Sequence, residues 1–260
     1  MTARPSRRNA WLLIALFGGG FALFVWFLIS SRASPLSVET HLREQPGMAA
    51  TLTAFQDGYP RHYTAFMNDL AAIANAQGET VAYDEATPSL RRFIAAKSGL
   101  IANAPAPELA RLATGTRDLI LALQQHDAEL CAQFVTRGTM DRARMPEAVT
   151  EQVGQVNALL IRAAARAEQG AAATRPPLGP QDGAAWYLAI RGVDPTLADA
   201  INSGARDEDA TPAHLCQRGA TLWRAAAALP EAQAANVTAH LVRQSFGPAA
   251  PQAPGSAPAL

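Results

Sequence analysis

The sequence predicts an all-α protein, with a single N-terminal transmembrane helix followed by an exported multi-helix bundle. Large apolar residues recur at every third or fourth position along most of the chain, as they do in helices that bury one face. No segment alternates β-branched and polar residues as a half-buried strand does. The membrane helix is predicted by residues 10–30, an uncharged run of 21 mostly apolar residues.

The apolar run has the length and the flanking charges of a membrane anchor. As a helix rising ~1.5 Å per residue it would measure about 31 Å, which matches the hydrocarbon core of a bilayer. Arg4, Arg7 and Arg8 precede it, and the positive-inside rule then places residues 1–9 in the cytoplasm. We expect residues 10–31 to cross a bacterial inner membrane once, with the main domain in the periplasm.

A cleavable signal peptide is the main alternative to the anchor. Ser31, Arg32 and Ala33 have the small-x-small form of a cleavage site. The apolar core of a signal peptide usually has only about 7–15 residues, which favours the anchor. Under either interpretation the remaining chain is exported, and in the second the mature protein is freely soluble.

Charge and composition argue against nucleic acid as a partner. Three of the 22 basic residues precede the apolar run, so 19 basic and 22 acidic residues follow it, with the two signs interspersed. This part of the chain has no basic field that would hold a polyanion. Of the 22 basic residues 21 are arginine, which together with abundant alanine is typical of a GC-rich bacterial genome.

Proline and glycine divide the exported chain into predicted segments. These are a membrane-proximal segment at 32–45, a bundle of long helices at 46–170, a Pro/Gly linker at 171–182, shorter helices at 183–246 and a disordered Pro/Ala tail at 247–260. In the bundle we expect a break near 58–60, a helix end near Gly78, a helix start at Thr87 and Pro88, and long helices over 107–137 and 146–169. Beyond the linker we expect helices over 181–191, 195–203, 212–229 and 230–245.

Cys131 and Cys216 are the two cysteines of the chain. An oxidising compartment would allow them to pair, and the favoured interpretation is a disulfide. Two buried free thiols are the alternative, because the sequence does not give the distance between them.

Two charged side chains fall inside predicted apolar stripes. Asp127 lies near the middle of the stripe of the 107–137 helix, and Lys97 holds a similar position on the helix before it. In one interpretation these two, with His126 at the edge of the stripe, form a polar site for acid–base chemistry or ligand capture. In the other, Lys97 extends its ammonium past the apolar face and Asp127 pairs with an arginine.

The chain carries no G-x-S-x-G elbow, H-E-x-x-H, P-loop or dinucleotide-binding motif. Its histidines and cysteines lack the spacing of metal ligands on one helix face, so we expect neither a metal nor a cofactor. The sequence therefore favours a membrane-anchored periplasmic module that binds another envelope protein or its own copy, or that has a structural role in the bacterial envelope. The alternative is an envelope enzyme with a site between helices that uses Lys97, His126 and Asp127.

Overall fold

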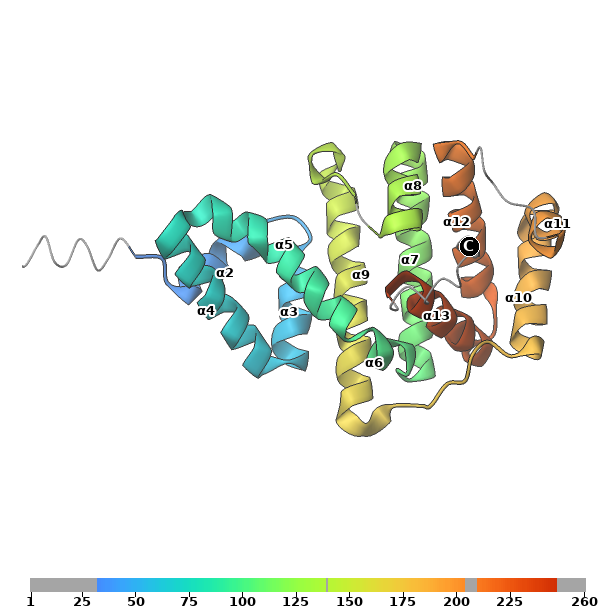
Figure 1. Cartoon of the computed structure of the whole chain (residues 1–260), viewed down its shortest axis with the longest axis horizontal. Coiled ribbons are helices and arrows are strands. Elements are labelled where there is room, and N and C mark those ends of the chain that lie inside the picture. The colour runs from blue at the N-terminus through green and yellow to red at the C-terminus, as the bar shows by residue number, and fades with distance from the viewer. Residues whose placement is uncertain (1–31, 139, 204–209, 247–260) are drawn as a thin grey trace, which may run out of the picture.

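The computed structural model describes residues 32–138, 140–203 and 210–246, and this part of the chain is helical with no strand. The predicted all-α class is confirmed. Figure 1 shows α2 to α5 gathered where the described chain begins and α10 and α11 at the opposite end, with the long α7 and α9 between them.

The transmembrane part of the prediction has no support from the described residues. None of their helices combines the length and the apolar character needed to cross a bilayer. The predicted cytoplasmic segment 1–9, the anchor 10–31 and the tail 247–260 lie outside the described residues and stay predictions.

The first group of helices comprises α2 (Pro35–Glu44), α3 (Met48–Gly58), α4 (Pro60–Gln77) and α5 (Glu79–Ala96). The predicted membrane-proximal segment is thus largely a helix. Ser34 caps α2 by accepting a hydrogen bond from the Ser37 N–H, and Pro35 fills the first helical position, where a missing N–H costs nothing.

The predicted helix start at Thr87 and Pro88 is wrong, because α5 begins at Glu79 and continues through Pro88. A proline inside a helix removes one backbone hydrogen bond and costs about 3 kcal/mol. The helix persists because its buried face extends on both sides of the proline and forms part of the core. This face consists of Ala82, Ala86, Leu90 and Ile94.

The central helices are α6 (Ser98–Ala102), α7 (Ala106–His126), α8 (Ala128–Arg137) and α9 (Glu147–Arg166), with a 3-10 turn η1 (Arg142–Arg144) before α9 and a π turn η2 (Ala167–Ala171) after it. The prediction of one helix over 107–137 is wrong. Asp127 has an extended backbone, φ −158° and ψ 107°, and its side chain caps α8. Aspartate competes with helical hydrogen bonding through its own carboxylate, and here that competition divides the helix.

A close backbone approach joins α3 to α9. The Thr51 hydroxyl donates to the carbonyl of Gly47 at 3.0 Å and lies 3.1 Å from that of Gly154. A Cβ added at Gly154 would lie 1.9 Å from the Gly47 carbonyl oxygen, so this position accepts no side chain. The first group of helices is therefore packed directly on the central ones.

The C-terminal helices are α10 (Pro180–Val193), α11 (Pro195–Ser203), α12 (Pro212–Ala228) and α13 (Glu231–Phe246), close to their predicted ranges. Both α12 and α13 pack on α7. Hydrogen bonds also fix the linker before them to the helical core. The Ala173 N–H donates to the Asn103 carbonyl at 2.8 Å, and the Arg243 guanidinium donates to the Arg175 carbonyl at 2.8 Å.

Candidate functional site

Lys97 lies at the junction between α5 and α6 and pairs with a glutamate of η2, the π turn that follows α9. Its Nζ is 3.1 Å and 3.2 Å from the two carboxylate oxygens of Glu168. The ammonium also lies 4.9 Å from the ring centroid of Tyr59 and 5.8 Å from that of Phe93. Lys97 is thus a partly buried cation, 19% exposed, with both a carboxylate and aromatic faces around it.

The charges of this cluster shift one another's protonation. The hydrogen bond from Lys97 lowers the pKa of Glu168 below its ordinary value, and the nearby Tyr59 hydroxyl acts in the same direction, against the effect of desolvation. Burial raises the pKa of Tyr59, and the negative charge of Glu168 raises it further. At neutral pH Glu168 is therefore a carboxylate, and the phenol of Tyr59 beside it is neutral.

Next to this ion pair is a hollow of about 230 Å³ between α3, α4 and α5. Its floor is aromatic, with the rings of Phe55 and Phe93 4.6 Å apart and those of Phe55 and Phe66 5.7 Å apart. We call it the aromatic groove, and its principal lining side chains are Phe55, His62, Phe66, Asp69, Ile73 and Phe93. Phe66, Ile73 and Phe93 are only partly buried, so the groove presents apolar surface to solvent.

Asp127 has a structural position at the start of α8. One of its carboxylate oxygens accepts hydrogen bonds from the N–H groups of Glu129 at 2.9 Å and Leu130 at 3.2 Å, and the other pairs with Arg144. Desolvation acts to raise the Asp127 pKa, but these N–H groups and the guanidinium outweigh it and hold that pKa below its ordinary value. This carboxylate is thus ionised, and both of its oxygens have hydrogen-bond partners.

His126 precedes Asp127 and shares its neighbour, since its Nε2 lies 3.2 Å from the Arg144 carbonyl oxygen. The structure brings these two residues together but not Lys97. In Figure 1, α6, which follows Lys97, and α8, which follows Asp127, lie at opposite ends of α7. Because α7 has 21 residues, its length is about 31 Å. The three candidates therefore share no common site.

The sequence predicts an arginine as one possible partner of Asp127 but does not identify Arg144, and it gives no sign of Glu168 as the partner of Lys97. Glu168 and Arg144 lie 71 and 17 positions from Lys97 and Asp127, respectively. No local pattern connects either pair, so only the tertiary fold reveals them. The helical spacing of the aromatic residues gives no sign that Phe66 and Phe93 stay partly exposed while Phe55 is buried.

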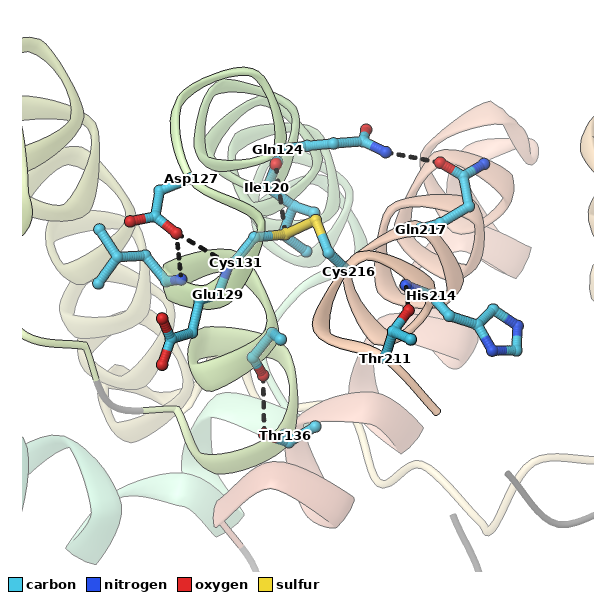
Figure 2. The surroundings of a disulfide bond; sticks show 12 residues. Ile120, Gln124, Asp127, Glu129, Cys131, Thr136, Thr211, His214, Cys216 and Gln217 are labelled. Atoms are coloured by element: carbon cyan, nitrogen blue, oxygen red, sulfur yellow. Dashed lines mark hydrogen bonds between the residues drawn. A yellow bond between two sulfur atoms is a disulfide. The ribbon is translucent and has the colours of Figure 1, made fainter. Parts of the chain in front are cut away.

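Cys131 of α8 and Cys216 of α12 form a disulfide, with their Cα atoms 5.3 Å apart (Figure 2). Both residues are buried. Beside the bridge, Gln124 Nε2 donates to the side-chain Oε1 of Gln217 at 2.6 Å. The bridge thus ties together helices that are far apart in sequence.

No group of three or more His, Cys, Asp or Glu side chains in the described part of the chain is arranged to hold a metal ion. The fold and these contacts define the described part of the chain as an all-α, disulfide-linked domain with an aromatic groove beside an ion pair. Comparison with known proteins gives no match to a family model, to a curated protein or to a solved structure.

Proposed function

We propose that this protein is a membrane-anchored helical module of the bacterial envelope, with its main domain in the periplasm, and that it acts by binding another envelope protein. The observation that supports the periplasmic assignment is the Cys131–Cys216 disulfide. Disulfides persist in oxidising compartments and are rare in the cytosol, where thiols are kept reduced. The bridge therefore supports export independently of the N-terminal sequence.

The apolar run and its preceding arginines supply the rest of the topology. Transfer of residues 10–31 from water into lipid is favourable, and Arg4, Arg7 and Arg8 favour retention of residues 1–9 on the cytoplasmic side.

The aromatic groove is the surface that we assign to the partner. Its partly buried Phe66, Ile73 and Phe93 side chains present apolar area at a concave site, as the anchor pockets of protein interfaces do. Covering 100 Å² of such area contributes roughly 2.5 kcal/mol. A partner segment that inserts one or two apolar side chains, with a polar flank toward His62 and Asp69, fits this site.

In-cell photo-crosslinking tests the binding role. A photoreactive phenylalanine analogue at Phe66 keeps an aromatic ring in the groove, and the same residue at Leu188 of α10, 64% exposed, serves as the control. We expect a defined crosslinked product from position 66 that is absent from position 188 and is lost on Asp69→Arg. A crosslink to a second copy of this chain would show that the groove mediates self-association and not binding to another envelope protein. The absence of any product would refute binding through the groove.

A reporter enzyme that is active only outside the cytoplasm, fused after residue 260, tests the compartment. Activity is expected, because the domain is assigned to the periplasm. N-terminal sequencing of the mature protein distinguishes a retained membrane anchor from a cleaved signal peptide. A start at Ser34 would replace the anchor by a cleaved signal peptide.

A further inference from the structure

The chain enters the described domain through a tightly held segment. The Ala33 N–H donates to Asn75 Oδ1 at 2.9 Å, and Asn75 Nδ2 donates back to the Ala33 carbonyl at 2.8 Å. The next residue, Ser34, already caps α2 in a reciprocal capping box with Ser37. The start of the described domain is thus held against α4 by two hydrogen bonds.

Exposed apolar side chains lie at this same end. Leu36, in the first turn of α2, is 73% exposed, the highest value for a large hydrophobic residue among those described. Val81, in the first turn of α5, is 42% exposed and follows the turn at Gly78 that comes after Asn75. Figure 1 shows the junction of α4 and α5 beside the start of α2.

Only a few residues separate Leu36 from the apolar run. Ser30 ends the run, and even a fully extended chain moves Ala33 at most about 10 Å beyond it. The headgroup region on each side of a bilayer is itself roughly 5–8 Å thick. Leu36 lies one turn further into the chain and so stays within reach of this layer.

We propose that this end of the domain, formed by the first turns of α2 and α5, rests on the outer surface of the inner membrane with Leu36 among the lipid headgroups. The proposal rests on the proposed function, since it takes residues 10–31 as the membrane span. The contact is apolar rather than electrostatic, because the chain after the run has an excess of acidic residues. The Ala33–Asn75 clamp then fixes the orientation of the domain, so that α10 and α11 face away from the bilayer.

Depth-dependent quenching of a fluorophore tests this contact. The full-length protein is reconstituted in vesicles of phosphatidylethanolamine and phosphatidylglycerol, with an environment-sensitive dye on Leu36→Cys or, as the matched control, on Leu188→Cys. The buried native disulfide does not compete for the dye. Nitroxide-bearing lipids are expected to quench the dye at position 36 several-fold more than at position 188, with a blue-shifted emission at position 36.

Flotation of the same vesicles separates the two proposals. If the protein floats with the vesicles but the two positions are quenched equally, the surface contact is refuted and the anchor stands. If the protein does not float, the proposed membrane anchoring fails. Asn75→Ala is expected to lower the fluorescence anisotropy at position 36, and an unchanged anisotropy would refute the role of the clamp.

Discussion

Removal of the disulfide is the perturbation with the largest effect on stability that we expect. The change is the double variant Cys131→Ala and Cys216→Ala, which avoids placing a polar hydroxyl at two buried positions. The bridge joins residues 85 positions apart and therefore restricts the unfolded chain strongly. On the chain-entropy relation, a loop of this length corresponds to about 4.6 kcal/mol at room temperature.

This loss should be evident as a lower melting temperature. For a domain of this size, each kcal/mol shifts Tm by about 2–4 °C, so the double variant is expected to melt about 9–18 °C below the wild type. The assay is thermal unfolding of the full-length protein in detergent, followed by far-ultraviolet circular dichroism, with and without a reductant.

The double variant is also the control, since a reductant should lower the Tm of the wild type toward that of the variant and leave the variant unchanged. Two results would refute the reasoning. In the first, the Tm of the wild type does not change after complete reduction. In the second, both cysteines of the protein purified from the envelope are alkylated after denaturation without a reductant, which means that they were not paired.

Three further predictions concern packing and charge. Gly154→Ala places a Cβ 1.9 Å from a facing carbonyl oxygen and should cost 1–3 kcal/mol or more in denaturant unfolding, roughly the range for overpacking, whereas Gly99→Ala, where no described atom lies within 4 Å of the added Cβ, should cost nothing. Asp127→Ala removes the cap of α8 and should cost about 0.5–2 kcal/mol by the same measurement, with Asp127→Asn much nearer to the wild type. The pKa values of Glu168 and Asp127 lie below their ordinary 4.5 and 3.8, so the stability these groups supply is complete above those values and is lost as the pH falls through the lowered ones. Denaturant unfolding from about pH 6 to about pH 2 should show this fall in the free energy of unfolding, and the fall should be smaller in Lys97→Met. The same fall in Lys97→Met as in the wild type would contradict the role of the Lys97–Glu168 pair.

Helix ends that have a local chemical signature could be predicted from the sequence. Thr211 and Pro212 start α12, and Thr211 accepts the hydrogen bond from the His214 N–H that a cap requires. Gly138 follows α8 with φ 61°, in the left-handed region that glycine tolerates best. In these places the residues themselves hold the information.

Local sequence patterns gave the wrong helix ends where tertiary packing or capping favoured another arrangement. Thr87 and Pro88 have the form of a helix start, yet the buried face of α5 continues past them. Asp127 was assigned to the interior of a helix because its position fits the apolar stripe, although its carboxylate is more stable as a cap.

The candidate site could be predicted only in part, because its geometry depends on contacts between distant residues. The sequence marks Lys97 as a cation in an apolar setting, and the structure does surround it with Tyr59 and Phe93. Its ion partner, Glu168, lies in η2 after α9, and no spacing rule links that turn to the end of α5. The aromatic groove likewise exists only where α3, α4 and α5 meet.

Protease accessibility combined with alkaline extraction of membranes tests the central claim most directly. Intact cells, spheroplasts and carbonate-washed membranes are probed with an antibody against the described domain. We expect the protein to stay in the washed membrane pellet, to survive protease in intact cells and to be digested in spheroplasts. A protein that is released by carbonate and remains protected from protease until the inner membrane is lysed would contradict the assignment of a membrane-anchored periplasmic module.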